Sequence, residues 1–311
     1  MPKVLVSDKL SETAVQIFRD NGVEVDFLPD VGKDKDKLLE IIGQYDGLAI
    51  RSATKVTEKI IAAATNLKVI GRAGIGVDNV DIPKATAKGI IVMNTPFGNS
   101  ITTAEHAITL LLSTARQIPA ADASTRASKW EKSKFMGVEV TAKTLGIIGC
   151  GNIGAIVADR AQGLKMKVIA FDPFLTPERA LDLGVEKVEL DELLGRADFI
   201  SLHTPLTDST RGILGADAFA KMKNGVRIVN CARGGLIDEA ALKVALESGK
   251  VAGAALDVYE VEPAKDNPLF EAPNVICTPH LGASTTEAQE NVARQVAEQK
   301  SAYLMHGAIQ N

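Results

Sequence analysis

One glycine-rich turn constrains this chain more than any other stretch. The apolar, β-branched run from Leu145 to Ile148 predicts a buried strand of a parallel sheet. Three glycines follow in the spacing G-x-G-x-x-G, and residues 155–164 after them favour a helix. This pattern is typical of a dinucleotide-binding turn, but a simple glycine-rich turn would carry the same spacing. The residues on either side of the glycines therefore have to distinguish a dinucleotide-binding turn from a simple glycine-rich turn.

Each glycine has its own part in a dinucleotide-binding turn. Gly149 permits the tight turn, Gly151 leaves room for a pyrophosphate near the backbone, and Gly154 lets the helix pack on its strand. The start of the helix then presents unpaired N–H groups and a partial positive charge to the phosphates. The turn would thus bind the pyrophosphate of a cofactor.

The strand after this helix supports the dinucleotide interpretation. The apolar run Lys167–Phe171 ends in Asp172, roughly 20 residues after the glycines, where a ribose-binding acid is expected. A carboxylate at this position accepts hydrogen bonds from the ribose hydroxyls and repels a 2′-phosphate. The order of strand, glycines, helix, strand and acid therefore predicts NAD, in preference to NADP.

Length and composition limit the classes of protein. A chain of 311 residues is long enough for two domains and a large core. Apolar residues make up 46% and charged residues 24%, as in ordinary globular proteins. The net charge is −4 and no long basic run occurs, which argues against nucleic acid or an anionic membrane as a partner.

The cysteines and the N-terminus indicate a cytoplasmic protein. Cys150, Cys231 and Cys277 are odd in number, form no C-x-x-C and adjoin apolar runs, so we expect reduced, buried thiols. A strand pattern begins at Lys3, which leaves no room for a signal peptide, and no apolar run is long enough to span a bilayer. No His, Cys, Asp or Glu cluster has zinc-ligand spacing, so no metal is expected.

Strands alternate with helices on both sides of the glycine turn, which predicts two doubly wound parallel sheets. The long segment 99–118 is expected as one helix connecting two domains, and 120–140, with Trp130, as an excursion that forms a possible subunit contact. The other expected strands are 3–7, 23–28, 47–50, 68–71, 90–93, 199–203, 226–230, 252–257 and 274–278, and the other helices are 12–20, a segment through Leu38 and Ile42, 57–64, 217–223, 239–248 and 285–305.

Polar residues at strand ends are the candidates for chemistry, because ligands bind beyond the carboxyl ends of parallel strands. Arg233 lies between a strand and two glycines, where a guanidinium could bind a carboxylate through two hydrogen bonds or simply occupy a surface turn. His280 follows the last strand and is either a base or a structural histidine. A contact with Glu262 would stabilise its protonated form, as a base that takes a hydroxyl proton requires.

The remaining histidines point less clearly to function. His106 lies within the predicted long helix and is expected in the core or in an interface. His203 ends a strand beside Thr204 and is expected to line the cofactor site at most, and His306 is expected to be solvated. Hydrolysis by a Ser–His–Asp triad has no support, because no G-x-S-x-G motif occurs.

With these residues in view, the chain resembles the D-isomer-specific 2-hydroxy-acid dehydrogenases over nearly its whole length. The RSATKV and GRAGIGVDN stretches narrow the resemblance toward members that act on D-3-phosphoglycerate. The stretches that carry it are RSATKV (51–56), GRAGIGVDN (71–79), MNTP (93–96), GNS (98–100), ARQIP (115–119), KWE (129–131), NCARGG (230–235), AALD (254–257) and PHLGAS (279–284).

The resemblance implies three groups of site residues. The catalytic trio falls on Arg233, Glu262 and His280. Arg51 and Arg72, both at strand ends, also suit a doubly charged anion by simple electrostatics. Cofactor contacts fall on Ile75, Gly149, Gly151, Asn152, Ile153, Gly154, Asp172, Thr204, Cys231, Asp257, Gly282 and Ala283, and contacts to the substrate's phosphate and carboxylate fall on Arg51, Ser52, Arg72, Gly74 and Asn99.

The resemblance also implies a fold and a reaction. The fold is α/β, with a Rossmann NAD-binding domain at 99–282 inserted into a discontinuous flavodoxin-like substrate domain at 1–98 and 283–311. The implied reaction is NAD-dependent oxidation of D-3-phosphoglycerate to 3-phosphohydroxypyruvate, the first step of L-serine biosynthesis, by a homodimer or homotetramer. Reduction of glyoxylate, hydroxypyruvate or another 2-oxo acid is the nearest alternative, and an NADH-sensing interaction protein on the same fold is another.

Overall fold

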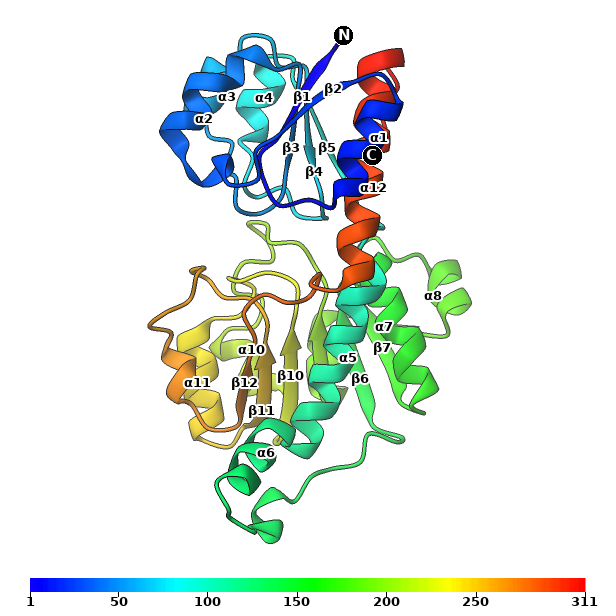
Figure 1. The fold of residues 1–311 in the computed structure, drawn as a ribbon. Coiled ribbons are helices and arrows are strands. Elements are labelled where there is room, and N and C mark those ends of the chain that lie inside the picture. Colours follow the sequence, from blue (N-terminus) through cyan, green and yellow to red (C-terminus); the bar gives the residue numbers. More distant parts are fainter. Residues whose placement is uncertain (311) are drawn as a thin grey trace. The chain divides into compact units, whose positions relative to one another are not determined.

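The computed structural model describes residues 1–310. The chain forms two compact units, one comprising Met1–Ser100 with the segment from Ala283 onward, and the other Ile101–Gly282 (Figure 1). The assignment of substrate to the first unit and of NAD to the second remains a prediction. Among the described residues, no helix is both long enough and apolar enough to cross a bilayer.

The first unit is built on a parallel sheet of five strands in the order β2-β1-β3-β4-β5. Because β1 pairs with both β2 and β3, the chain reverses direction across the sheet between β1 and β3. In open parallel sheets this switch point opens a crevice at the carboxyl ends of the strands. The strands are β1 (Lys3–Val6), β2 (Glu24–Phe27), β3 (Gly47–Ile50), β4 (Val69–Arg72) and β5 (Ile91–Asn94).

Helices cover both faces of this sheet. One face packs against α1 and α12, which lie side by side although they come from opposite ends of the chain (Figure 1). The other face packs against α2, α3 and α4. Ser11 caps α1 as predicted, since its Oγ accepts a hydrogen bond from Thr13 N. The helices are α1 (Glu12–Asp20), α2 (Lys35–Ile41), α3 (Glu58–Ala63), α4 (Ile82–Ala87) and α12 (Thr286–His306), with 3₁₀ turns η1 (Val31–Lys33) and η2 (Ile42–Gln44).

The second unit is built on a parallel sheet of seven strands in the order β12-β11-β10-β9-β6-β7-β8. Its switch point lies between β6 and β9, and this is the Rossmann strand order extended by one edge strand. The predicted fold class, two doubly wound parallel sheets, is confirmed. The strands are β6 (Thr144–Ile148), β7 (Lys167–Phe171), β8 (Glu186–Lys187), β9 (Phe199–Leu202), β10 (Val226–Asn230), β11 (Val251–Leu256) and β12 (Val275–Cys277).

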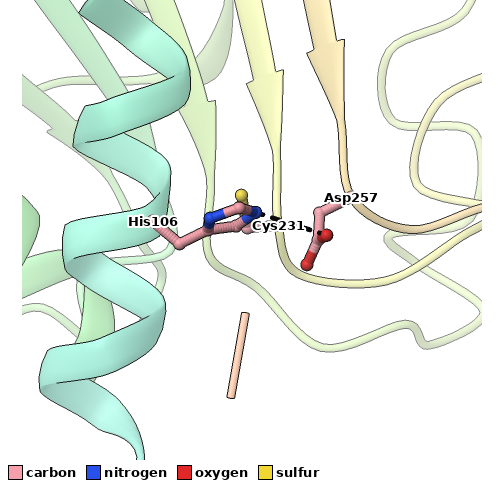
Figure 2. Close-up of side chains that lie close together, drawn as sticks. All are labelled: His106, Cys231 and Asp257. Atoms are coloured by element: carbon pink, nitrogen blue, oxygen red, sulfur yellow. Dashed lines mark ion pairs between the residues drawn. The ribbon is translucent and has the colours of Figure 1, made fainter. Parts of the chain in front are cut away.

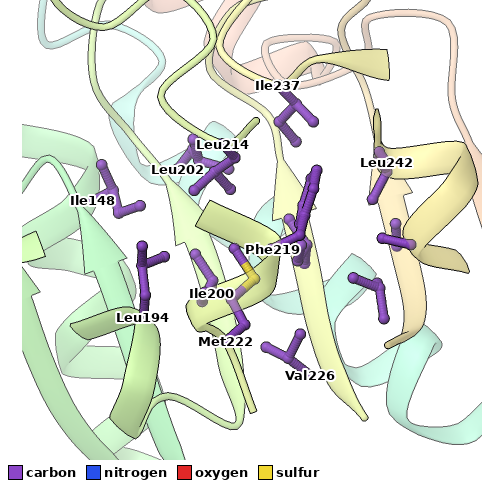
Figure 3. Close-up of a cluster of buried hydrophobic side chains, with 14 of the residues drawn as sticks. Ile148, Leu194, Ile200, Leu202, Leu214, Phe219, Met222, Val226, Ile237 and Leu242 are labelled. Atoms are coloured by element: carbon purple, nitrogen blue, oxygen red, sulfur yellow. The ribbon is translucent and has the colours of Figure 1, made fainter. Parts of the chain in front are cut away.

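Two apolar layers enclose this sheet, because successive strand residues point to opposite faces. Ile148, Leu202 and Leu242 belong to the layer under α9, α10 and α11 (Figure 3). Leu145 and Ile147 belong to the layer under α5, α7 and α8. The helices are α5 (Ser100–Arg116), α6 (Ile118–Arg126), α7 (Asn152–Gly163), α8 (Pro177–Leu183), α9 (Leu190–Arg196), α10 (Ala216–Lys221) and α11 (Glu239–Glu247), with η3 (Lys132–Phe135) and η4 (Pro268–Glu271).

The helix predicted over 99–118 is confirmed as α5, which ends at Arg116, and a second helix, α6, begins at Ile118 and continues into the segment expected as an excursion. Gln117 adopts a left-handed backbone, φ 53°, and this residue separates α5 from α6. Glutamine rarely adopts this conformation, so a break at this residue was not predicted. No residue of α6 is buried. The segment beyond α5 therefore begins as a helix, and Trp130 after it is 87% exposed.

Candidate functional site

The glycine turn after β6 has no room for side chains at two of its glycines. Gly149 has φ 91°, and a Cβ there would lie 2.7 Å from the backbone carbonyl of His203. A Cβ on Gly154 would lie 2.1 Å from Gly149 O, so the helix start packs directly on the strand end. The tight turn and the helix–strand packing expected from the sequence are thus seen in the structure.

The third glycine leaves open space. Gly151 is the N-cap of α7, and a Cβ there would meet no protein atom within 4 Å. Asn152 and Ile153 form the first turn of α7, which begins three residues earlier than the predicted 155–164. Their N–H groups and the helix dipole provide a site for an anion such as a pyrophosphate. The residues present therefore fit the phosphates of a dinucleotide.

Asp172 also holds the glycine turn in place. Its Oδ2 accepts a hydrogen bond from Cys150 N at 2.8 Å, and its Oδ1 accepts one from Phe174 N at 2.8 Å. Each carboxylate oxygen has further lone pairs for ribose hydroxyls. Burial, together with the charge of Asp172, raises the pKa of Cys150 to about 11, so its thiol is protonated at neutral pH.

His203 is a neutral residue at the end of β9. Its Nε2 lies 2.7 Å from Ser201 Oγ, and its Nδ1 is buried without a hydrogen-bond partner. Burial lowers the pKa of His203 to about 4. The imidazole is therefore uncharged at neutral pH. Thr204 follows it at the switch point, next to the glycine turn.

Arg233 sits in a turn that two neighbouring residues fix. The buried Asn230 donates from Nδ2 to Arg233 O at 2.9 Å and accepts from Ala232 N at 3.0 Å. A Cβ on Gly234 would lie 1.8 Å from Tyr259 O, so the turn packs against the chain after β11. The guanidinium donates from Nη1 to Ala232 O at 2.7 Å and is half-buried. Arg233 thus has a fixed backbone at a strand end.

Glu262 and His280 form the pair that the sequence suggested. His280 Nδ1 lies 2.7 Å from Glu262 Oε2, and Tyr259 N donates to Glu262 Oε1 at 3.1 Å. Burial alone would raise the pKa of Glu262, but the hydrogen bond and the charge of His280 lower it below its usual value. Since Nδ1 faces the carboxylate, Nε2 is the ring nitrogen that points away from this pair.

Asp257 fixes the turn that carries His280. The carboxylate is fully buried; its Oδ1 accepts from Thr278 Oγ1 at 2.6 Å and Leu281 N at 2.7 Å, and its Oδ2 accepts from Gly282 N at 2.8 Å. His280 itself has a left-handed backbone, φ 57°, which is uncommon outside glycine. Asp257, expected only as a cofactor contact, is thus an internal anchor of this turn.

His106 was assigned to the core or an interface from sequence, but it reaches this anchor. Its Nε2 lies 3.3 Å from Asp257 Oδ1 and 3.4 Å from Thr278 Oγ1 (Figure 2). Cys231 lies in the same cluster, and donor atoms of the three side chains are within 4.8 Å of one another. A histidine on an otherwise Ala- and Leu-rich helix was the only sequence signal. The strands that bring Cys231 and Asp257 to it are far apart in the chain.

One cysteine was assigned wrongly. Cys150 and Cys231 are buried as expected, but Cys277 is exposed. It ends β12, the edge strand of the sheet, where one side lacks a neighbouring strand. An apolar run of residues cannot distinguish an edge strand from a central one.

In the first unit, Arg51 begins a loop fixed by a buried acid. Asp8 Oδ2 accepts from Arg51 N at 2.5 Å and from Thr54 N at 3.2 Å. Asn79 Nδ2 donates to Arg51 O and Thr54 O, each at 2.7 Å. Arg51 Nη1 donates to Lys9 O at 3.1 Å, and Ser52 is exposed. The loop lies at the β1–β3 switch point, where ligands of such sheets bind.

Arg72 ends the neighbouring strand β4. Its Nη1 donates to Ala73 O at 3.1 Å, and its guanidinium covers Gly74, where a Cβ would lie 1.5 Å from Nη1. Gly74 N donates to Thr95 Oγ1 at 2.7 Å. The nearby Ile75 O accepts from the Asn94 side chain at 2.8 Å. Arg51 and Arg72 therefore extend from adjacent strands of one sheet.

Three other predicted contacts lie on either side of the boundaries between the units. Asn99 is 8% exposed and precedes α5. Gly282 O accepts from Thr103 Oγ1 at 2.9 Å, which ties the end of the His280 turn to α5. Ala283, in the first unit, accepts at its carbonyl from Gln289 Nε2 at 2.8 Å.

Comparison with known proteins gives a consistent family. Residues 108–282 match the family described as D-isomer specific 2-hydroxyacid dehydrogenase, NAD binding domain. D-3-phosphoglycerate dehydrogenases from Archaeoglobus fulgidus and Bacillus subtilis are each 52% identical, over 95% and 96% of this chain and 56% of their own length. The structure of a glyoxylate reductase from Paecilomyes thermophila has a TM-score of 0.90 at 35% identity, covering 100% of this chain and 97% of that one. The chain thus spans about half the length of these curated relatives, but nearly all of the reductase.

Proposed function

The chain belongs to the D-isomer specific 2-hydroxyacid dehydrogenase family, and we propose that it oxidises D-3-phosphoglycerate to 3-phosphohydroxypyruvate with NAD. This reaction would be the first step of L-serine biosynthesis. The observation that carries the choice of substrate is the pair Arg51 and Arg72 on adjacent strand ends of the first unit. Two guanidinium groups suit a substrate that carries a phosphate as well as a carboxylate.

The residues of the second unit suit the chemical step. His280 Nε2 would take the proton of the C2 hydroxyl, while Glu262 holds Nδ1 and stabilises the imidazolium that forms. Arg233, held by Asn230, would bind the substrate carboxylate through two parallel hydrogen bonds. These three side chains orient the substrate and move one proton at a defined atom.

The cofactor site would be formed by the glycine turn and its surroundings. Gly151, Asn152 and Ile153 offer open space and helix N–H groups to the pyrophosphate, and Asp172 offers acceptors to the ribose hydroxyls. We also assign cofactor contacts to Thr204, Cys231 and Asp257, and to Gly282, Ala283 and Ile75. When bound, NAD supplies the nicotinamide ring that accepts the hydride leaving C2 of the substrate.

Two further assignments follow from chemistry rather than from the fold. The three cysteines are free thiols, in keeping with a reducing compartment, and we assign the protein to the cytoplasm. We also propose that it assembles as a homodimer or homotetramer. The support is the exposed helix α6 together with Ile118, Trp130 and Met136, which are 53%, 87% and 78% exposed.

A second candidate function is reduction of glyoxylate, hydroxypyruvate or another 2-oxo acid. It is favoured by the glyoxylate reductase that matches this chain over nearly its whole length. Both reactions would use the same trio and the same cofactor. They differ in the anion that the first unit has to bind, and this difference can be measured. An NADH-sensing interaction protein would instead bind a partner in an NADH-dependent manner and turn over no 2-hydroxy acid.

The test is NAD reduction measured side by side with D-3-phosphoglycerate, D-glycerate and D-lactate. We expect kcat/KM to be highest for the phosphorylated acid. Arg51→Ala and Arg72→Ala should each reduce kcat/KM for D-3-phosphoglycerate at least tenfold more than for D-glycerate, because only the phosphorylated acid loses a charge-assisted contact. Equal effects on both acids would overturn the substrate assignment, and His280→Ala with near-normal turnover would overturn the assigned base.

A further inference from the structure

The side chain of His106 lies beside the carboxylate of Asp257, which already accepts three hydrogen bonds from the turn that carries His280. Most buried residues of α5 are small or apolar, among them Ala104, Ala107 and Leu111, and the buried Thr103 donates to Gly282 O. His106 is the ionisable residue of this helix that lies beside a buried carboxylate, and its side chain is 18% exposed. Its ring points at Asp257, with Nε2 3.3 Å from Oδ1 (Figure 2). Nε2 also lies 3.4 Å from Thr278 Oγ1, and this hydroxyl itself donates to the Asp257 carboxylate, so both polar neighbours of the ring belong to the same group of hydrogen bonds.

The cluster of His106, Cys231 and Asp257 could in principle bind a divalent cation, since it combines three ligand types. Its hydrogen bonds argue for another role. Asp257 Oδ1 already accepts from Thr278 Oγ1 and Leu281 N at 2.6 and 2.7 Å. Burial and the charge of Asp257 raise the pKa of the Cys231 thiol, whereas metals bind the thiolate. A cation would have to displace donors from the turn and deprotonate a buried thiol.

The contacts instead connect His106 to the candidate base. Asp257 accepts the N–H groups of Leu281 and Gly282, the two residues that follow His280. Thr278, two residues before His280, donates its hydroxyl to the same carboxylate. The left-handed backbone of His280 therefore lies between three hydrogen bonds that end on Asp257. Any change in the position or charge of that carboxylate is transmitted to the turn.

We propose that His106 is a positioning residue, whose Nε2–H donates to Asp257 and keeps this carboxylate oriented to hold the His280 turn. The proposal rests on the assignment of His280 as the base. Burial alone would raise the pKa of Asp257, but hydrogen bonds from His106, Thr278 and Leu281 hold it below its usual value. His106 lies on α5, which belongs to the same compact unit as Asp257 and His280.

The test compares His106→Leu with His106→Gln. Leucine fills the space but cannot donate, whereas the glutamine Nε2 can occupy nearly the same position as the imidazole Nε2. We expect His106→Leu to lower kcat about tenfold with little change in KM for the hydroxy acid. The pH at which kcat/KM is half-maximal should move as well, because the turn holding the base is altered. His106→Gln should recover at least half of the lost rate. His306→Leu, at an exposed position on α12, is the control and should behave as the wild type.

A packing role would give the reverse order, since leucine suits an apolar helix face and glutamine does not. If His106→Leu matched the wild type in rate and pH profile while His106→Gln lost stability, the proposal would be overturned. Calorimetric titration with Zn²⁺ alone separates the metal-site alternative. We expect no binding that depends on His106, and zinc binding abolished by His106→Gln would likewise overturn the proposal.

Failure of this inference can be distinguished from failure of the proposed function. If the wild type does not oxidise D-3-phosphoglycerate, the substrate assignment fails, and the His106 variants are then compared with whichever hydroxy acid the wild type does oxidise. If the wild type oxidises D-3-phosphoglycerate but both variants keep normal kcat and pH profiles, only the positioning role fails.

Discussion

Two buried aspartates hold the candidate loops of the two units, and they do so differently. Asp8 in the first unit is 2% exposed, and Asp257 in the second is 0% exposed. Asp257 accepts hydrogen bonds at both oxygens, including one from the hydroxyl of Thr278. Asp8 accepts two backbone N–H groups at Oδ2 alone, and its Oδ1 is buried without a hydrogen-bond partner.

The difference matches what each loop is proposed to do. A base must be held within hydrogen-bond distance of the proton it removes. The turn of His280 therefore requires an anchor whose two carboxylate oxygens both accept hydrogen bonds. Arg51 has only to place a positive charge near an anion, and that interaction weakens slowly with distance. The first unit also tolerates other unsatisfied groups, since Lys300 Nζ and Gln299 Oε1 on α12 are buried without partners. Among the described residues of the second unit, buried side-chain atoms without partners include His203 Nδ1 and Arg227 Nε, and neither belongs to the turn of His280.

The largest effect should come from Asp257→Asn, which tests the anchor of the His280 turn. Whichever way the amide turns, its NH₂ group faces a donor, either Gly282 N or the donors at Oδ1. We expect kcat to fall about 100-fold, because several charge-assisted hydrogen bonds are lost together. Steady-state kinetics with near-ultraviolet circular dichroism would separate this loss from unfolding. A folded variant with kcat within threefold of the wild type would contradict the role of Asp257.

The next effect concerns the free energy of unfolding. It tests whether buried groups without hydrogen-bond partners destabilise the first unit. Lys300 is 0% exposed, and burial lowers its pKa well below 10.5. The unfolded chain then binds a proton that the folded chain does not, so stability decreases as pH falls below 10.5. Lys300→Met should raise the free energy of unfolding at pH 7 by about 2 kcal/mol.

The same variant provides its own check through pH. The advantage of Lys300→Met over the wild type should shrink as pH rises from 7 toward 10.5, where the unfolded lysine also loses its proton. Denaturant unfolding at several pH values measures this difference directly. A gain that stays constant over that range would show that Lys300 is charged in the folded protein and has a partner.

A smaller effect should follow from Gly74→Ala, which displaces the Arg72 guanidinium and leaves Asp8 and Asp257 unchanged. A Cβ at this position would lie 1.5 Å from Arg72 Nη1, and φ is 140°. We expect KM for D-3-phosphoglycerate to rise about tenfold with kcat little changed. Gly89→Ala is the matched control, because Gly89 also has a positive φ, 75°, but has no atom within 4 Å of the added Cβ. Equal KM values in both variants would mean that the Arg72 guanidinium binds no substrate.

These comparisons also show which features the sequence could reveal. The glycine spacing, the alternation of strands and helices and the polar strand ends are local patterns, and they predicted the two parallel sheets and the approach of Glu262 to His280. The left-handed Gln117 and the exposed Cys277 were missed, because conformation and edge position depend on tertiary neighbours. The short helices α4, α8 and α9 were missed, although α3 and α10, which are equally short, were predicted.

The anchors themselves were the least predictable part. His106 and Asp257 are separated by 151 positions, and neither belongs to a motif whose spacing requires the contact. Asp8 follows an ordinary strand, and only the fold brings it to the loop of Arg51. A buried acid that binds backbone N–H groups leaves no periodic signal in its own neighbourhood. Such residues are identified from hydrogen bonds in the structure.

The smallest effect should come from Asp8→Asn, the same isosteric change that is expected to be severe at Asp257. Here the amide oxygen can keep both N–H bonds, from Arg51 and Thr54, while the NH₂ group replaces the oxygen that has no hydrogen-bond partner. The substitution also removes a negative charge beside Arg51, so repulsion of an anionic substrate decreases. We expect kcat to be unchanged and KM for D-3-phosphoglycerate to fall about threefold, with a smaller fall for D-glycerate. Measuring both KM values at low and high salt isolates the charge effect, which salt should suppress. A loss of kcat as large as that of Asp257→Asn would remove the distinction between the two anchors, and the first unit would then need the same precision as the second.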